Sequence, residues 1–156
     1  TVRSCSRART AVAALKRGLA TMRATSSFGA AAAALVGAAL MPVPFALPVG
    51  AALACLAGFV AIPRAVTDRD LDPGWVVIDE VAGMWIAMLA LPAVTWYGPF
   101  CAFAIFRLID IWKPGPVGWA DRRHGATGIM LDDLIAGGCT AAILWGAQVL
   151  TPGVFG

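Results

Sequence analysis

The stretch FRLIDIWKPGPVGWADRRHGATGIMLDDLIAG, residues 106–137, separates two apolar parts of the chain and concentrates charge between them. It contains four of the nine acidic residues of the chain: Asp110, Asp121, Asp132 and Asp133. It also contains four basic residues: Arg107, Lys113, Arg122 and Arg123. Ionised side chains are costly in apolar surroundings and therefore suggest a functional site. We expect the carboxylates to bind a divalent cation and the basic groups to bind an anion such as phosphate.

The composition of the chain indicates a membrane protein. Of its 156 residues, 60% are hydrophobic and only 13% are charged, and the mean hydropathy is +0.79. An ordinary soluble domain is about 25% charged. The length predicts a single domain over residues 1–156. We divide it into a basic N-terminal segment at 1–23 and a membrane and catalytic core at 24–156.

Prolines and charged residues divide the apolar sequence into short helices. The expected helices lie near residues 28–41, 47–62, 81–91, 100–112 and 134–149, with a loop over 117–127. The predicted fold is therefore all-α, a multihelical membrane-embedded bundle of about five short apolar helices. Small residues at four-residue spacing in the first helix would let it approach its neighbours closely.

The distribution of charge predicts how the bundle lies in a membrane. Basic residues occur in 1–23, 64–69 and 107–123, whereas the expected turns at 41–49 and 92–99 carry no charge. Cytoplasmic loops of membrane proteins carry an excess of Lys and Arg. We therefore expect the N-terminus and the charged segments in the cytoplasm. The polar active-site segments would then lie at the cytoplasmic ends of the helices.

Two pairs of adjacent carboxylates precede apolar runs. Asp79 and Glu80 stand before one run, and Asp132 and Asp133 stand before another. A single acid at such a position could cap a helix and interact with its dipole. Two adjacent acids also suit a cation site, and Gly83 leaves space one turn after the first pair. Oxygen ligands without His or Cys partners favour Mg²⁺, or else Mn²⁺.

These patterns predict a role for each charged residue of the site. The expected metal ligands are Asp79, Glu80, Asp132 and Asp133, with Asp110 or Asp121 completing or orienting the site. The expected catalytic residues are Asp79, Glu80, Asp110, Asp132 and Asp133. The expected phosphate-binding residues are Arg107, Lys113, Arg122 and Arg123. For any one of them, the alternative is a structural salt bridge or a side chain that reaches the lipid headgroups.

The sequence shows no clear covalent nucleophile. It lacks a phosphate-binding P-loop and a GxSxG serine motif. Its four cysteines form no CxxC pair, and His124 has no partner at zinc-ligand spacing. Water activated by a metal ion is the simplest attacking group. An aspartate nucleophile stays open as the alternative.

Three segments resemble motifs of the phosphatidylglycerophosphatase A family. They are DPGWVVIDEVAGMW at 72–85, FRLIDIWKPGP at 106–116 and DRRHGATGIMLDDLIAG at 121–137. The resemblance implies an all-helical, multi-pass enzyme of the bacterial inner membrane with its active site facing the cytoplasm. It implies Mg²⁺-dependent hydrolysis of phosphatidylglycerophosphate to phosphatidylglycerol and inorganic phosphate, in phospholipid biosynthesis. The expected partners are the phospholipid substrate and membrane lipids, with no nucleic acid, and a homo-oligomer stays open.

Two other classes of membrane protein also use clustered carboxylates. A CDP-alcohol phosphotransferase binds a divalent metal with membrane aspartates, but its Asp-Gly-x-x-Ala-Arg opening is absent from this sequence. A small ion transporter would place its acids near the middle of the membrane rather than at helix ends. Release of phosphate by the purified protein would distinguish these classes.

Overall fold

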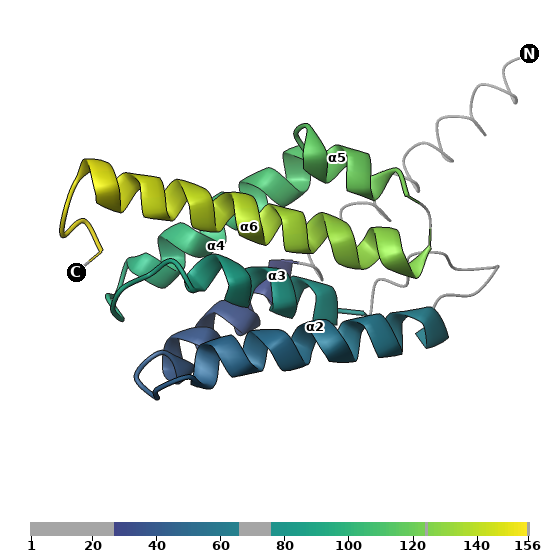
Figure 1. Ribbon diagram of the computed structural model, residues 1–156, viewed down its shortest axis with the longest axis horizontal. Helices are drawn as coiled ribbons and strands as arrows, with labels where there is room; N and C mark the ends of the chain where they lie inside the picture. The colour runs from purple at the N-terminus through teal and green to yellow at the C-terminus, as the bar shows by residue number, and fades with distance from the viewer. Residues whose placement is uncertain (1–26, 66–75, 124, 156) are drawn as a thin grey trace, which may run out of the picture.

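The computed structural model describes residues 27–65, 76–123 and 125–155, and these residues form helices and no strand. The helices are Ser27–Leu40, α2 at Ala46–Ala65, α3 at Ile78–Met88, α4 at Gly98–Trp112, α5 at Pro116–Asp121 and α6 at Ala126–Leu150 (Figure 1). The all-α prediction is confirmed for this part of the chain. Five of these helices correspond to the apolar helices expected from the sequence, and α5 is an additional one.

The longer helices run back and forth between two ends of an elongated bundle (Figure 1). Helices α3 and α6 begin at the end where α2 finishes. The opposite end contains the turn before α2 and the turn between α3 and α4. We name the first the charged end, because the described acidic residues lie at the start of α3, in the last part of α4, in α5 and in the early part of α6. We name the second the apolar end.

The predicted loop over 117–127 is wrong in its first part, because α5 occupies Pro116–Asp121. Pro116 is the first helical residue, where its fixed φ favours a helix and its missing N–H costs nothing. Val117 and Ala120 are buried, and α5 packs against α6. The proline and glycine residues of this segment therefore mark the ends of a short helix rather than a continuous loop.

Helix α6 begins at Ala126 rather than near Leu134, so its acid pair lies inside the helix and not at its start. Gly125 has a φ of 93°, a conformation that favours glycine, and turns the chain into the helix. A Cβ on Gly128 would lie 1.5 Å from the carbonyl oxygen of Arg123, so only glycine permits this compact entry. The early start adds about two helical turns before the acids.

Two glycines bring α3 and α6 into backbone contact. A Cβ on Gly83 would lie 2.5 Å from the carbonyl oxygen of Asp133, and a Cβ on Gly137 would lie 2.2 Å from the carbonyl oxygen of Gly83. Asp79 and Asp133 each precede one of these glycines by four residues, which places them on the same helix faces as the glycines. The crossing therefore sets the acid pairs of the two helices beside each other. The room at Gly83 that the sequence suggested for a cation is taken up by the backbone of Asp133 and the ring of Phe106.

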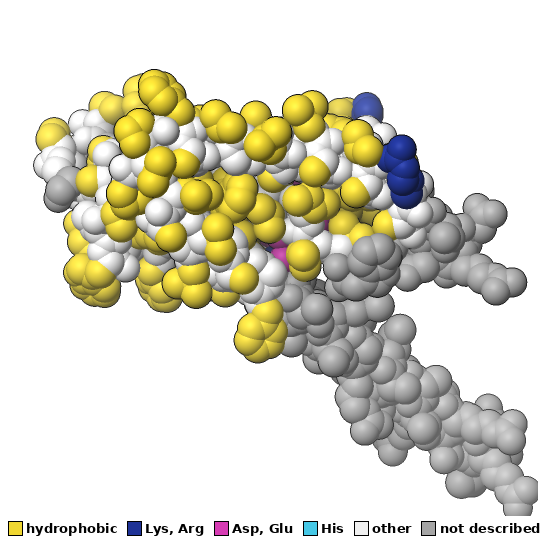
Figure 2. Space-filling model, turned by 90° about the horizontal axis from the view of Figure 1, so that it is seen from below, with side chains coloured by type: hydrophobic (Ala, Val, Ile, Leu, Met, Phe, Trp, Pro, Cys, Tyr) yellow, Lys and Arg dark blue, Asp and Glu magenta, His cyan; other side chains and the backbone are white. Residues whose placement is uncertain are grey.

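Much of the outer surface is apolar. Figure 2 shows hydrophobic side chains over most of the visible face, with Lys and Arg side chains gathered at one end. By length and composition, α2 and α6 could each cross a membrane, and less than half of each is buried inside the bundle. Ser27–Leu40 is apolar but shorter. The membrane-protein prediction is thus supported by two candidate spans in the described residues.

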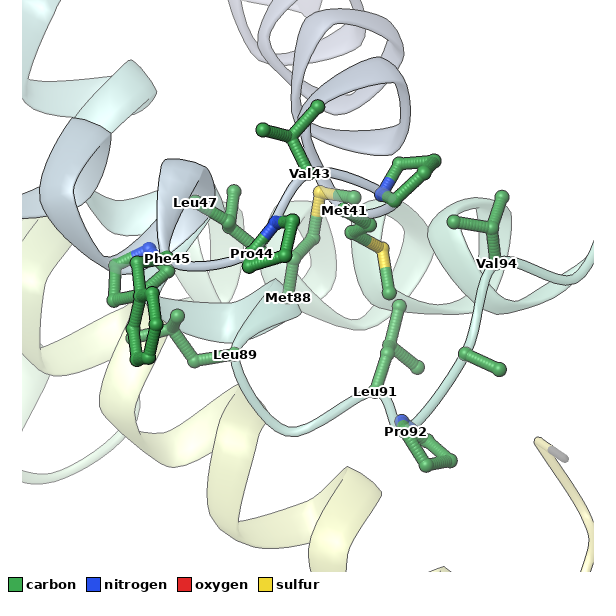
Figure 3. Close-up of a pocket in the computed structure, with 13 residues that line it drawn as sticks. Met41, Val43, Pro44, Phe45, Leu47, Met88, Leu89, Leu91, Pro92 and Val94 are labelled. Carbon is green, nitrogen blue, oxygen red and sulfur yellow. The ribbon is translucent and has the colours of Figure 1, made fainter.

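The apolar end contains an open cavity of about 580 Å³ between its two turns (Figure 3). The walls come from residues 41–48 and 88–94, and every lining residue is hydrophobic. The side chains of this lining could neither transfer a proton nor neutralise the charge of a phosphate. The chemistry expected from the sequence must therefore be sought at the charged end.

Candidate active site

The charged end contains every buried charged side chain of the described residues. They are Asp79, Glu80, Arg107, Asp132 and Asp133, each 5–8% exposed. The acids come in pairs from α3 and α6, and the arginine comes from α4. All five belong to the site predicted from the sequence, so the structure brings together residues that lie more than 50 positions apart in the chain.

Asp133 lies at the centre of the acidic cluster. The carboxylates of Asp110, Asp79, Asp132 and Glu80 are close enough for each of their charges to act on it. No ion pair within the described residues includes Asp133. A carboxylate buried among like charges is costly unless a cation compensates it. The centre of the cluster therefore suits a positively charged ligand.

Arg107 connects three helices around this cluster. Its Nη1 atom donates to Asp110 Oδ2 at 2.5 Å and lies 3.8 Å from Glu80 Oε1. Its Nη2 atom donates to the hydroxyl of Ser27 at 3.3 Å. The guanidinium thus joins α4 to α3 and to the first residue of the helix Ser27–Leu40. Charge-assisted contacts of this kind fix the positions of both partners.

Lys113 holds the outer acids of the cluster. It ends α4 in a left-handed conformation, with φ of 47° and ψ of 53°. Its ammonium donates to Asp132 Oδ2 at 2.7 Å and to Asp121. Burial lowers the pKa of Lys113, but the hydrogen bonds and charges of Asp121 and Asp132 outweigh this effect, so the pKa lies above its usual value. The side chain is therefore a charged bridge between α5 and α6.

The two acid pairs share a local geometry. Asp79 Oδ1 accepts a hydrogen bond from the backbone N–H of Glu80 at 2.9 Å, and Asp132 Oδ1 accepts one from Asp133 at 3.0 Å. In the first turn of α3, backbone N–H groups have no partner within the helix, so capping explains part of the first pair. The second pair lies inside α6, where such groups already bond within the helix. Capping therefore does not explain the second pair.

The donor chemistry of the cluster suits a hard divalent cation. The part of the chain that the structure describes contains six acidic side chains. Two cations, Arg107 and Lys113, form ion pairs with four of them. Carboxylate oxygens without His or Cys are the ligands that Mg²⁺ prefers. Among the same residues, no group of three or more Asp, Glu, His or Cys side chains is arranged to hold a metal ion. The ligand type and the excess negative charge fit the ion, whereas the present side-chain positions do not form a closed coordination shell.

Arg122 and Arg123 are more exposed than the other two predicted phosphate ligands, Arg107 and Lys113. Both are exposed, and neither forms an ion pair within residues 27–65, 76–123 and 125–155. The Arg123 guanidinium lies 4.0 Å from the centre of the Trp119 ring. A phosphate role for Arg122 and Arg123 stays a prediction. His124 lies outside the described residues.

Two residues of the first helix contribute to the site and are absent from the prediction. Ser27 accepts the hydrogen bond from Arg107, and a Cβ on Gly29 would lie 2.4 Å from Glu80 Oε2. The spacing of small residues in this helix does signal close packing. It does not show that the neighbour of Gly29 is a carboxylate, because that depends on how α3 lies against the helix.

Comparisons with known proteins relate this arrangement to a family of lipid phosphatases. A profile of the family Phosphatidylglycerophosphatase A matches residues 11–148. The chain is 49% identical over 75 residues to the phosphatidylglycerophosphatase A of Escherichia coli K12, an alignment that covers 47% of the chain and 44% of that protein. It is 37% identical over 87 residues to the phosphatidylglycerophosphatase A of Haemophilus influenzae, covering 54% of the chain and 53% of the relative.

A third relative carries a different name. The chain is 45% identical over 69 residues to a Bacteroides thetaiotaomicron protein provisionally named phosphatidylinositol-3-phosphatase, covering 42% of the chain and 43% of the relative. The chain thus spans about half the length of the curated relatives it matches. No solved structure matches it. Because the family profile covers most of the sequence, the chain belongs to the phosphatidylglycerophosphatase A family.

Proposed function

We propose that the protein hydrolyses phosphatidylglycerophosphate to phosphatidylglycerol and inorganic phosphate, with Mg²⁺ as cofactor, in phospholipid biosynthesis. One observation carries this proposal: Asp133 is buried among four other carboxylates, and Arg107 and Lys113 contact members of the same cluster. The family and the names of two relatives supply the substrate.

The proposed location is the bacterial inner membrane, with the charged end at the cytoplasmic surface. Helix α2 has 20 residues and would extend about 30 Å, which matches the hydrocarbon core of a bilayer. The turns of the apolar end, residues 41–45 and 89–97, carry no charge. A charge-free end could face the far side of the membrane, in agreement with the positive-inside rule. A lipid headgroup would then reach the acids while its acyl chains stayed in the bilayer.

The charged side chains divide into two groups by what they would bind. The carboxylates of Asp79, Glu80, Asp132 and Asp133 would hold the cation. When bound, a divalent cation neutralises charge on the phosphate and lowers the pKa of water. Arg107 would bind phosphate oxygens through its planar fork, and Lys113 would add a compact positive charge. Each base would exchange part of its present contact with a carboxylate for a contact with the substrate.

The proposed reaction transfers a phosphoryl group from the lipid to water. The water oxygen forms a bond to phosphorus, and the bond between phosphorus and the glycerol oxygen breaks. A carboxylate of the cluster would accept the proton from water, and the leaving glycerol oxygen would take up a proton. If an aspartate attacked first, an aspartyl phosphate would form and water would then release the phosphate. Both routes leave the carbon–oxygen bond of the lipid intact.

Phosphate release by the purified chain tests this function. With phosphatidylglycerophosphate in mixed micelles, we expect release that requires Mg²⁺, stops with EDTA and returns when Mg²⁺ is restored. Hydrolysis in ¹⁸O-labelled water should place one labelled oxygen in the phosphate and none in the lipid alcohol. Label in the alcohol would contradict the mechanism. No phosphate release in the presence of Mg²⁺ would contradict the function and favour a transferase or a transporter.

Phosphatidylinositol 3-phosphate is a second substrate to test, because of the name of the Bacteroides relative. Both lipids carry a phosphate monoester on the headgroup, so the same acids and bases could act on either. We expect the larger kcat/KM for phosphatidylglycerophosphate, since two of the three relatives are named for it. A reversed preference would retain the phosphatase chemistry but change the substrate.

A further inference from the structure

The charged end has an acidic interior and, among the described residues, a basic exterior. Five of its six acids are buried or nearly so, and the most exposed acid, Asp121, is paired with Lys113. In contrast, Arg64, Arg122 and Arg123 are exposed and form no ion pair in the described parts of the chain. The positive charges that remain for an external partner therefore lie on the outside.

Arg122 and Arg123 lie within four residues of an exposed tryptophan, Trp119, and a second exposed tryptophan, Trp112, ends α4. We name Trp112, Trp119, Arg122 and Arg123 the α5 platform. Trp112 is 75% exposed and Trp119 is 48% exposed, and the Arg123 guanidinium lies 4.0 Å from the centre of the Trp119 ring. The platform thus combines large amphipathic rings with cations on one short segment of chain.

The backbone holds this platform firmly on the bundle. A Cβ on Gly118 would lie 2.5 Å from the carbonyl oxygen of Lys113, so α5 folds tightly onto the end of α4. On its inner side, Val117, Gly118 and Ala120 are buried, and the helix packs against α6. The exposed side is therefore presented outward on a fixed support rather than on a loose loop.

We infer that the α5 platform binds the headgroups of anionic phospholipids in the bilayer around the protein, outside the substrate site. Tryptophan rings favour the membrane interface, where one part of the ring is apolar and the N–H is hydrated. Guanidinium groups form strong hydrogen bonds with phosphate oxygens. Basic and aromatic groups on the outer side of a short helix are typical of a segment that lies at a lipid surface.

Charge complementarity selects this occupant over the others. The cavity at the apolar end has only hydrophobic lining residues and offers no charged side chain to a headgroup. The acidic interior already engages Arg107 and Lys113, whereas Arg122 and Arg123 have no acidic partner among the described residues. An arginine at the membrane surface raises the local concentration of anionic lipid by about fivefold. The platform would therefore concentrate anionic lipid, including an anionic substrate, next to the site.

This inference rests on the proposed membrane location but not on the proposed reaction. The test uses the purified chain in phosphatidylcholine bilayers that contain a small amount of brominated lipid, either phosphatidylglycerol or phosphatidylcholine. Bromine quenches tryptophan fluorescence at short range, so the ratio of the two quenching strengths measures preference for anionic lipid. We expect a clear preference for the anionic lipid, reduced at high salt because the attraction is electrostatic.

Matched variants distinguish the platform from the site. In the double variant Arg122→Gln and Arg123→Gln, the preference for anionic lipid should fall by about fivefold or more. The double variant Arg122→Lys and Arg123→Lys keeps the charge and should retain most of it. Asp133→Asn is expected to be inactive but should keep the lipid preference of the unaltered chain. The lipid measurement therefore tests the platform independently of the proposed reaction. An unchanged preference in the Gln variant, or equal loss in the Lys variant, would overturn the inference.

Discussion

The two ends of the bundle each contain a non-glycine residue with a positive φ. At the apolar end Phe45 has a φ of 62°, and at the charged end Lys113 has a φ of 47°. Phe45 is 79% exposed beside a hydrophobic cavity, whereas the Lys113 ammonium bridges Asp121 and Asp132. A left-handed conformation costs either residue about 1–2 kcal/mol. At the charged end the left-handed conformation positions a cation against the acids. At the apolar end it only allows the chain to turn.

The ends also differ in how closely they are packed. At the charged end, Gly29, Gly83 and Gly137 allow contacts that a single Cβ would break. At the apolar end, two turns leave an open cavity of about 580 Å³. Tight packing is thus found where carboxylates from separate helices must meet. Looser packing is found where only hydrophobic contact is needed.

The largest expected effect follows from Asp133→Asn, which removes the central charge of the cluster with little change in shape. We expect activity to fall by ~10²-fold or more, the usual scale for loss of a metal ligand or its support. Asp121→Asn is the control, because Asp121 is exposed at the edge of the cluster and should cost less. Both would be assayed as phosphate release at saturating Mg²⁺. Full activity of the Asp133 variant would show that Asp133 is not part of the active site.

A methyl group at the α3–α6 crossing should have the next largest effect. In Gly83→Ala the new Cβ would meet the backbone of Asp133, which cannot move aside as a flexible side chain can. We expect a loss of about 1–3 kcal/mol in the free energy of unfolding, as for an overpacked core. Gly138 lies on α6, and a Cβ there would have open space around it, so Gly138→Ala should be neutral or stabilising by up to ~1 kcal/mol. Equal melting temperatures of the two variants would contradict the close crossing.

The sequence predicts the members of the acidic cluster well, because charged groups are conspicuous in an apolar chain. Asp79, Glu80, Asp132 and Asp133 are all buried together, as expected from the pairs that precede apolar runs. Hydrophobic length and proline positions also predict the five apolar helices. These features depend on local composition, which is visible without knowing how the helices pack.

Features that depend on packing are less visible in the sequence. The helix α5 is missed because proline and glycine indicate a break without showing how the chain continues between breaks. The early start of α6 is missed because an acid pair before an apolar run resembles the start of a helix, whereas the compact entry at Gly128 depends on its close contact with Arg123. The difference between Arg107, which is buried and pairs with the acids, and Arg122, which is exposed, requires the helix arrangement. Residue type alone makes both of them candidate phosphate ligands.

Arg107→Lys tests whether the shape of the cation at the charged end matters as well as its charge. Lysine would keep the positive charge but could not contact Asp110, Glu80 and Ser27 at once as the planar guanidinium does. We expect activity to fall about tenfold, equivalent to about 1.4 kcal/mol in the activation free energy. Arg107→Ala should lose more. If the Lys variant were as active as the unaltered chain, only the positive charge of Arg107 would matter and not its planar shape.

The ion pairs of Lys113 predict a pH dependence with a definite sign. Because the folded-state pKa is raised, the stabilisation is fully present below the ordinary lysine pKa of about 10.4 and is lost as the pH rises through the folded value. Lys113→Met should therefore cost about 1 kcal/mol, the scale of a partly exposed pair, and this cost should stay constant between about pH 7 and 10. Unfolding measured in detergent across this range is the test. A cost that disappeared near neutral pH would contradict the raised pKa.

The smallest expected effect compares the two left-handed residues directly. Phe45→Gly should relieve the backbone at little cost, because the side chain is mostly exposed, and should stabilise the protein by ~1 kcal/mol. Lys113→Gly relieves the same kind of strain but removes the ammonium that bonds to Asp121 and Asp132, so the gain should be cancelled and activity should fall. Both variants would be measured for unfolding and for phosphate release under identical conditions. If both gained stability equally and kept full activity, the left-handed lysine would have no more role at the charged end than the phenylalanine has at the apolar end. A gain at Phe45 alone would show that the strain at Lys113 is maintained by the contacts of its side chain with the acidic cluster.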